Sequence, residues 1–559
     1  MLKLQPSISP RPELSVSQGR RTRMEIAAGA LERFGYAVES ALTRKPWISP
    51  LLLSAAFLPC ALVKASRRPF NFDEILTEYV AALPSFDKIW KALAGHAESS
   101  PPLFHLLFKL SADAFGWNQL GLRVPSILGY LTMMLCTYFM VRRYAGPLYG
   151  WIGALSTILT FGVWYGVQAR PYALLLGCSS VALLCWQQVC RNHNRRWMLA
   201  GLWLSLATAT SLHYFAMFSF AAIGFGEVVR IGQRRRIDWP IWGTLALAAT
   251  PLLVFRPLLR ANLVLKKGYF APATLHQFVV GTSRFYLPQD GVIWAAFALL
   301  AGSCILIFSR RSLQPPADAE TGPVYEWAAL LALLLTPVEA FAAGKLLTGI
   351  FQIRYAIVTL IGFSILLPLC LQRLFRNSRA AALITVAFLL LCFGGWYALK
   401  STAEDQAGDL ATNLTPWLRA ADASRLPIIV SNPLQYLRLA HSGGNDLKAV
   451  LVYTPDAEEA LKYTGVNSGD YNLAGLRGLA PLNLPTYGSF TDSHREFLVL
   501  WDNSRLDWIV PKLQNAGAQL RLHSTQGERV LFLVDLPGTA TPLAIAANSA
   551  ADNRTLRGK

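Results

Sequence analysis

The chain carries little charge for its length. Only 15% of its 559 residues are Asp, Glu, Lys or Arg, whereas 53% are hydrophobic, including 29 Phe and 16 Trp. Charged residues make up about a quarter of an ordinary soluble chain. This shortage excludes a soluble multidomain protein and predicts a polytopic α-helical membrane protein.

The chain also lacks the patterns that indicate a metal or a nucleotide. Its 8 cysteines lie in or beside apolar segments, none falls in residues 400–559, and no CxxC pair occurs. We therefore expect neither a disulfide framework nor a zinc site. No nucleotide-binding motif is present and no stretch interleaves basic with aromatic residues, so no nucleic-acid partner is expected.

Long apolar segments recur through the first 400 residues. A helix needs roughly 20 predominantly apolar residues to cross a membrane. By this measure we expect about 11 spans, near residues 47–63, 122–141, 149–167, 170–190, 197–212, 213–229, 239–259, 292–308, 326–346, 352–372 and 379–398.

The distribution of basic residues predicts the orientation. The net charge of +19 is concentrated in the first 399 residues. Arginine pairs and clusters mark alternate loops, as at Arg142-Arg143 and Arg310-Arg311, and such loops favour the cytoplasmic side. We expect a basic cytoplasmic segment at 1–45 and a transmembrane domain at 46–399, in a bacterial inner or plasma membrane. Anionic membrane lipids are expected partners of this basic surface.

The last part of the chain has a different pattern. Short apolar runs bounded by turns alternate with helical patterns, which predicts an α/β domain at 400–537. With an odd number of spans, this domain is extracytoplasmic. The tail at 538–559 is small and polar, and we expect it to be disordered. The runs read as strands are Ile428–Ser431, Ala449–Tyr453, Glu496–Trp501 and Val530–Val534, and the helical patterns are Asp456–Tyr463 and Asp507–Ala516.

The first outer loop, residues 64–121, holds the first candidate site residues. Asp73 and Glu74 follow the first span, where a carboxylate can act as a general base on an acceptor hydroxyl or hold a divalent metal ion. The alternative is a pair of ordinary solvated acids. Glu98 is a second acidic candidate, and Pro102 begins an aromatic helix, as prolines at helix starts do. His105 falls on the apolar face of that helix and is expected to be packed or hydrogen-bonded.

Further polar residues fall on the same outer side of the predicted spans. Arginine side chains at this depth suit a phosphate, because the guanidinium offers forked donors, although snorkelling to the interface is the alternative. A capping or packing role is the alternative for the histidine among them. The candidates for phosphate or substrate binding are Gln168, Arg170, Tyr172, His213, Tyr214, Arg354 and Tyr355.

The order of these motifs resembles a known family. Asp73-Glu74 is followed by SPPLFHLLF from Ser100, LRVPS from Leu122, YGVQARPYALL from Tyr165, HYF from His213 and RY from Arg354. The set is similar to bacterial GT-C glycosyltransferases of the dolichyl-phosphate-mannose protein mannosyltransferase and aminoarabinose transferase type. The family pattern has histidine where this chain has Ser100, and a glutamate that is missing between Gln168 and Ala169.

The resemblance implies an inverting glycosyltransferase that uses a polyprenyl-phosphate sugar. Asp73, with Glu74 beside it, would serve as the base or acceptor-orienting carboxylate. Arg170 and Arg354 would hold the donor phosphate, and the acceptor would be a lipid, a polysaccharide or a protein. Two other classes stay open: a flippase or transporter of a lipid-linked sugar, and a cell-envelope scaffold without activity.

Overall fold

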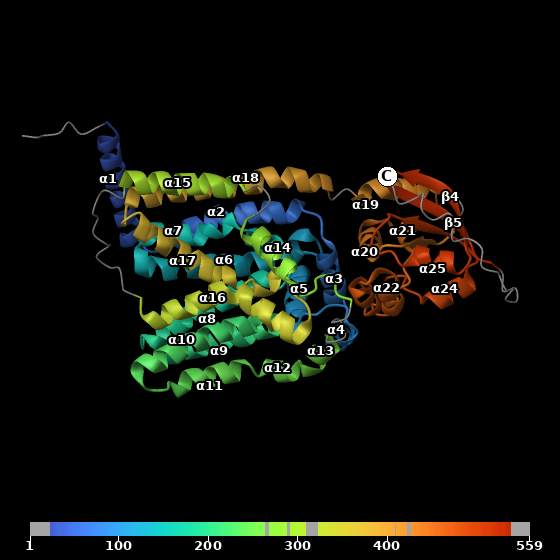
Figure 1. Ribbon diagram of the computed structural model, residues 1–559, viewed down its shortest axis with the longest axis horizontal. Coiled ribbons are helices and arrows are strands. Elements are labelled where there is room, and N and C mark those ends of the chain that lie inside the picture. The colour runs from blue at the N-terminus through green and yellow to red at the C-terminus, as the bar shows by residue number, and fades with distance from the viewer. Residues whose placement is uncertain are drawn as a thin grey trace, which may run out of the picture.

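The computed structural model describes residues 23–262, 268–287, 291–308, 322–407, 410–421 and 426–537. A helical bundle forms one end of the molecule and an α/β domain forms the other (Figure 1). The helices before the α/β domain are α1 (Arg23–Arg44), α2 (Ile48–Arg67), α3 (Phe72–Ala81), α4 (Phe86–Ala94), α5 (Pro102–Phe115), α6 (Gln119–Ala145), α7 (Pro147–Leu155), η1 (Ser156–Leu159), η2 (Phe161–Val167), α8 (Tyr172–Cys190), α9 (Arg195–Leu212), η3 (Tyr214–Ala216), α10 (Met217–Arg234), α11 (Trp239–Ala248), α12 (Pro251–Val254), α13 (Arg256–Ala261), α14 (Leu275–Tyr286), α15 (Val292–Phe308), α16 (Val324–Ala343), η5 (Gly344–Thr348), η6 (Ile353–Ala356), α17 (Thr359–Leu374) and α18 (Arg379–Ala407).

The bundle confirms a polytopic helical membrane protein. In the described residues, 6 helices are long and apolar enough to cross a membrane, and a bent pair, Pro147–Leu159 with Phe161–Val167, makes up to 7. Three shorter apolar helices, Trp239–Val254, Val292–Phe308 and Thr359–Leu374, accompany them. Each of the 11 expected spans falls on helical structure, but α9 and the shorter helices do not meet the length and hydropathy of a full span.

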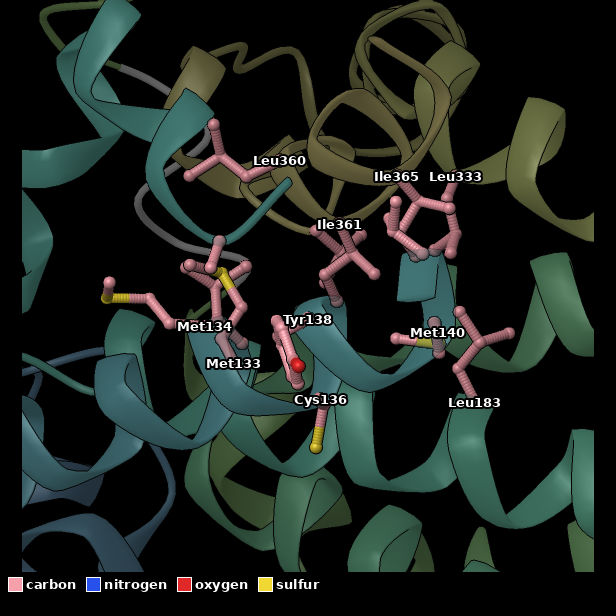
Figure 2. Close-up of a cluster of buried hydrophobic side chains, with 14 of the residues drawn as sticks. Met133, Met134, Cys136, Tyr138, Met140, Leu183, Leu333, Leu360, Ile361 and Ile365 are labelled. Carbon is pink, nitrogen blue, oxygen red and sulfur yellow. The ribbon is translucent and has the colours of Figure 1, made fainter. Parts of the chain in front are cut away.

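The core of the bundle is packed around α6. Its buried side chains, including Met133, Met134 and Tyr138, meet residues of α8, α16 and α17 (Figure 2). Small residues allow the closest helix approach: a Cβ at Gly129 would lie 2.6 Å from the Ala173 carbonyl oxygen. Close backbone contact of this kind is a general means of packing helices in a membrane. It fixes the start of α8, and with it the segment that precedes α8, against α6.

The first outer loop is folded into three helices, α3, α4 and α5. Asp73 and Glu74 therefore lie in the first turn of a helix, where Glu74 is fully buried and Asp73 is partly exposed. Asn71 caps α3: its side chain accepts from the Glu74 N–H at 3.0 Å, and the Glu74 carboxylate accepts from the Asn71 N–H at 3.1 Å. This reciprocal capping box satisfies two donors at the helix start. Pro102 is the first residue of α5, as expected.

The α/β domain has one 5-stranded sheet in the order β2-β1-β3-β5-β4. The first three strands are parallel, and β5 pairs antiparallel with β3 and β4. Strands and helices occur at all of the predicted places, but of Ala449–Tyr453 only Leu451–Val452 is strand, because a helix runs to Val450. Strand β4 was not expected. The elements are α19 (Leu410–Ala421), β1 (Ile428–Val430), α20 (Pro433–Ser442), α21 (Asn445–Val450), β2 (Leu451–Val452), α22 (Ala457–Thr464), α23 (Ser468–Ala474), α24 (Tyr487–Ser493), β3 (Glu496–Trp501), α25 (Ile509–Asn515), β4 (Gln519–Gln526) and β5 (Arg529–Asp535).

The α/β domain packs directly on the helices of the first outer loop. Residues of α3 and α4 share one hydrophobic core with the sheet, and His441 of α20 bonds to Glu78 of α3 at 2.8 Å. The Asn472 side chain donates to the Ala97 carbonyl at 3.0 Å. The expected domain boundary at residue 399 falls inside α18, which continues to Ala407. The expected tail at 538–559 and residues 1–22 lie outside the described residues.

Candidate functional site

Asp73 and Arg354 meet at the end of the bundle that faces the α/β domain. The Arg354 Nη1 donates to Asp73 Oδ2 at 2.8 Å. The Asp73 side chain is 34% exposed and the Arg354 side chain 22% exposed, so this pair faces solvent from a recess. The expected convergence of a carboxylate with an arginine from a late span is thus present.

Arg170 approaches the same helix start from another direction. Its Nη1 donates to the Asp73 carbonyl oxygen and to Thr77 Oγ1, each at 3.1 Å, and forms an ion pair with Glu98 Oε1. His105 contacts the other oxygen of Glu98 through Nε2. His105 is fully buried and hydrogen-bonded, as expected. The structure therefore brings Asp73, Arg170 and Arg354 together, and Glu98 holds Arg170 in place.

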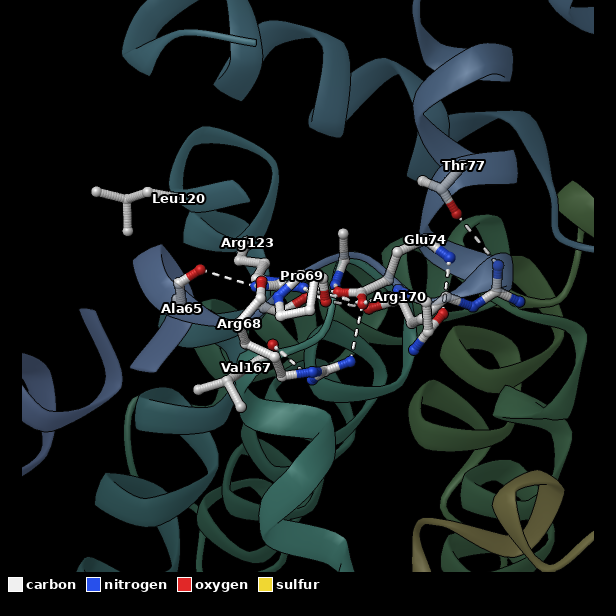
Figure 3. A network of polar contacts seen from close by, with 12 residues as sticks. Ala65, Arg68, Pro69, Glu74, Thr77, Leu120, Arg123, Val167 and Arg170 are labelled. Atoms are coloured by element: carbon white, nitrogen blue, oxygen red, sulfur yellow. Dashed lines mark hydrogen bonds and ion pairs between the residues drawn. The ribbon is translucent and has the colours of Figure 1, made fainter. Parts of the chain in front are cut away.

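Glu74 is the centre of a separate buried network (Figure 3). Its carboxylate is fully buried and accepts from Arg68, from Arg123 twice, and from the backbone N–H groups of Asn71 and Ala169. The distances run from 2.8 to 3.1 Å. Five donors engage its two oxygens, so Glu74 fastens α3 to α6 and to the segment before α8. The sequence prediction paired it with Asp73 as a candidate of equal chemistry, but the two neighbours have different surroundings.

Aromatic side chains form the wall beside Arg354. The Tyr355 hydroxyl bonds to the Tyr269 hydroxyl at 3.0 Å, and its ring stacks on Phe215 with centroids 4.3 Å apart. Arg354 Nη2 lies 3.5 Å from the same Tyr269 hydroxyl. These contacts hold a late segment of the chain against the loop that follows α13.

His213 and Tyr172 lie behind this wall. The His213 Nδ1 accepts from the Phe215 N–H at 3.2 Å and so caps η3, which was the alternative considered for it. Its ring centroid lies 5.2 Å from that of Tyr172. The Tyr172 ring in turn faces the Arg170 guanidinium at 5.9 Å. Both residues support the arginines by packing.

The remaining candidates lie at the edge of the site. Gln168 is half-buried, and its carbonyl accepts from the Arg170 N–H at 2.8 Å. Tyr214 packs on the core shared with the α/β domain, and Pro102 is buried at the start of α5. Within the part of the chain that the structure describes, none of these three side chains forms a hydrogen bond with the side chain of Asp73 or of either arginine.

The charges around Asp73 favour its ionised form. Burial alone would raise the pKa of the Asp73 carboxyl, but the guanidinium groups of Arg354 and Arg170 outweigh it and hold this pKa below its usual value. Glu98 behaves alike: burial opposes ionisation, and Arg170 with His105 lowers its pKa. Both carboxylates are therefore ionised at neutral pH.

Two arginine donors beside Asp73 have no acceptor in the described structure. Among the described residues, the Nε atoms of Arg170 and Arg354 are buried and make no hydrogen bond. A buried N–H without an acceptor is costly, so a bound anion that reaches these donors is stabilised. The site is thus built around an aspartate and has two unused guanidinium donors beside it.

The residues present do not form a metal site. In the described ranges, no three His, Cys, Asp or Glu side chains are grouped so that they could hold a metal ion. Asp73 and Glu98 are the carboxylates nearest to the arginines, and each is already paired with a guanidinium. A divalent ion would have to displace these arginines, so the donor set does not fit the metal considered above.

Sequence reasoning assigned no role to four residues that build this site. They are Arg68, Thr77, Arg123 and Tyr269. Arg123 belongs to the LRVPS motif, and the N-x-x-E pattern at 71–74 is a capping signal, so both could have drawn attention. Tyr269 has no local signal because its partners, Tyr355 and Arg354, lie far away in the sequence. Arg68 pairs with Glu74 six residues later, but no recognised motif marks this pair.

Comparisons with known proteins agree with the resemblance seen in the motifs. Residues 99–259 match the family model described as dolichyl-phosphate-mannose-protein mannosyltransferase. This match confirms the predicted resemblance to membrane glycosyltransferases of that type. No curated protein matches the chain in sequence.

The solved structures that are similar to this chain include two membrane proteins. ArnT from Cupriavidus metallidurans in the apo state is 14% identical, with a TM-score of 0.45 over 88% of this chain and 98% of that chain. The same protein bound to undecaprenyl phosphate is 15% identical, with a TM-score of 0.44 over 89% of this chain and 99% of that chain. The archaeal oligosaccharyltransferase AglB from Archaeoglobus fulgidus was solved in complex with an inhibitory peptide and a dolichol-phosphate. It is 12% identical, with a TM-score of 0.38 over 81% of this chain and 70% of that chain.

Proposed function

We propose that this membrane protein transfers a sugar from a polyprenyl-phosphate donor to an acceptor hydroxyl, with inversion at the anomeric carbon. The observation that carries the proposal is the convergence of Asp73 with Arg354 and Arg170. The match of residues 99–259 to a glycosyltransferase family that uses a lipid-phosphate sugar supports it.

The arginines account for the donor phosphate. Arg354 and Arg170 each keep a buried Nε donor without an acceptor in the described structure. A phosphate has enough acceptor oxygens to engage both, and charge-assisted hydrogen bonds of this kind are roughly twice as strong as neutral ones. Their positive charge also stabilises the phosphate as it leaves.

Asp73 accounts for the base. In the proposed step, Asp73 accepts the proton of the acceptor hydroxyl while the hydroxyl oxygen attacks the anomeric carbon. The bond from that carbon to the phosphate oxygen breaks, and its electron pair leaves with polyprenyl phosphate. Because attack comes from the face opposite the phosphate, the configuration inverts.

The pairing of Asp73 with Arg354 links donor binding to the strength of the base. With Arg354 beside it, the Asp73 carboxylate is a weak base because its pKa is lowered. A donor phosphate bound to the Arg354 Nε brings a negative charge close to Asp73, and this charge offsets part of the positive charge of the guanidinium. Donor binding therefore weakens the hold of Arg354 on Asp73 and raises the affinity of Asp73 for a proton.

The other acidic residues position these groups. Glu98 holds the Arg170 guanidinium, and Glu74 fixes the start of α3 through Arg68 and Arg123. The distribution of basic loops favours a position outside the cytoplasm for the Asp73 end of the bundle and the α/β domain, and the acceptor would reach the site from there.

Purified protein supplied with a radiolabelled polyprenyl-phosphate sugar and candidate acceptors tests the proposal. We expect label on the acceptor, with release of polyprenyl phosphate and an inverted linkage by NMR. In sealed proteoliposomes, movement of the labelled lipid between leaflets without any transfer would instead indicate a flippase. Retention of configuration in the product would contradict direct attack from the opposite face.

A further inference from the structure

Helix α1 docks across the end of the bundle that lies opposite the α/β domain (Figure 1). Glu32 of α1 caps the start of α18: its carboxylate accepts from the Arg379 N–H at 2.9 Å and from the Ala380 N–H at 3.0 Å. A Cβ at Gly35 would lie 2.9 Å from the Arg379 backbone, so the two helices approach very closely. These contacts fix α1 against the start of α18 and hold it at the ends of the spans.

The outer surface of α1 suits the membrane interface. Ile26 and Phe34 are 59% and 58% exposed, and Trp47, just before the first span, is 61% exposed. An amphipathic helix with exposed apolar side chains, and an aromatic residue at a span end, are typical of the lipid headgroup boundary.

A cavity of about 660 Å³ lies between α1 and the ends of α6, α8 and α18. Four arginines line it, Arg44, Arg142, Arg143 and Arg379, together with a single acid, Glu39. Arg379 forms an ion pair with Glu39. In the described chain, the other three form no ion pair, and the Arg143 Nη1 is buried without an acceptor.

These features call for an anion. In the described residues these three guanidinium groups form no ion pair, although the charge of Glu326 acts on Arg143 from beyond ion-pair distance. An arginine fork matches the oxygens of a phosphate. The cavity has apolar lining at Phe139 and Leu184 and lies where three apolar helices end, which is the depth of a phospholipid phosphate. We propose that this cavity binds a phosphate group, supplied by the headgroup of an anionic lipid or by a free phosphate.

The proposal is tested on the full-length protein by native mass spectrometry and thermal unfolding. The probes are phosphatidylglycerol, phosphatidylcholine and inorganic phosphate. The test variant is Arg142→Gln with Arg143→Gln. The matched control is Arg196→Gln with Arg236→Gln, which removes two exposed arginines from the same end of the bundle.

We expect the test variant to retain phosphatidylglycerol about tenfold more weakly than the wild type, and the control to retain it unchanged. A lipid source predicts that phosphatidylglycerol raises the unfolding temperature while inorganic phosphate and phosphatidylcholine do not. If inorganic phosphate raises it in the wild type but not in the test variant, the source is free phosphate.

Equal phosphatidylglycerol retention by wild type and test variant, with no effect of inorganic phosphate in either, would overturn the proposal. Equal loss in the test variant and in the control would also overturn it, because a diffuse surface charge would then explain the binding. If the test variant does not elute as a folded protein, Arg44→Gln replaces it, since this side chain is exposed. A loss of about threefold is then expected, and no loss overturns the proposal.

Discussion

Arg354 lies 281 positions after Asp73 in the chain, yet its guanidinium donates to the Asp73 carboxylate at 2.8 Å. The first helix of the outer loop and the segment before α17 are thereby joined at a single ion pair. Since the pair is partly exposed, it is accessible to substrate in a way that the Glu74 pairs are not.

Replacing Asp73 by Asn is expected to lower kcat by at least about a hundredfold, because general-base catalysis contributes about that much or more. The exchange keeps the shape of the side chain, so the protein should fold and unfold as the wild type does. Transfer of radiolabelled sugar and thermal unfolding in detergent measure the two effects. Asp87→Asn is the control, since Asp87 is an exposed acid of the same loop paired only with Lys91. Full activity in Asp73→Asn would remove Asp73 from the mechanism.

Replacing Arg354 by Gln should change the pH dependence as well as the rate. Arg354 lowers the Asp73 pKa against the effect of burial, so its removal lets this pKa rise. The acid limb of the kcat/KM profile is therefore expected to move to higher pH, because Asp73 with a raised pKa loses its proton only at higher pH. At neutral pH, kcat/KM should fall by about a hundredfold as a phosphate contact is lost. Arg284→Gln, an exposed arginine of α14, should change neither the profile nor the rate.

Much of the fold could be predicted from the sequence because membrane helices and buried strands each form a local run of apolar residues. Apolar length located the spans, and β3 was predicted with its observed bounds, Glu496–Trp501. In contrast, β4 was missed because its residues, Gln519–Gln526, are polar and mostly exposed. A strand of this kind exists through its pairing with β5, and pairing leaves no apolar signal in its own sequence.

The sequence predicted which residues belong to the candidate site better than it predicted the contacts between them. Motif order identified Asp73 as the base with Glu74 beside it, and Arg170 and Arg354 as phosphate ligands, but it did not show that Glu74 has a separate set of partners. The difference between the two acids depends on Arg68 and Arg123, which both donate to the Glu74 carboxylate. Long-range pairing decides which of two adjacent carboxylates is free to meet a substrate.

Replacing Glu74 by Gln should therefore destabilise the protein, unlike the same change at Asp73. The change leaves the buried Arg68 and Arg123 guanidinium groups without their carboxylate, and breaking a buried ion pair costs about 3–5 kcal/mol. We expect a clearly lower unfolding temperature and low yield, with activity lost in proportion to folded protein. If folded Glu74→Gln protein has a normal unfolding temperature and no activity, Glu74 takes part in the reaction directly.

The contact between the α/β domain and the outer loop should affect activity from a distance. Gly475 packs on the turn after α4, where a Cβ would lie 2.4 Å from the Ala97 nitrogen and 2.5 Å from the Gly95 carbonyl oxygen. These backbone atoms cannot move without shifting the segment that leads to Glu98, which holds Arg170. Gly475→Ala is therefore expected to lower kcat/KM several-fold and to increase hydrogen exchange in α4.

The control for this contact is Gly488→Ala in α24, where an added Cβ meets nothing within 4 Å. Gly488→Ala should leave activity and exchange unchanged, because a methyl group there enters open space. If Gly475→Ala increases exchange in α4 but leaves kcat/KM at the wild-type value, the domain packs on the loop without positioning the site. If neither quantity changes, the backbone approach at Gly475 has been absorbed by the turn, and the α/β domain does not constrain Glu98.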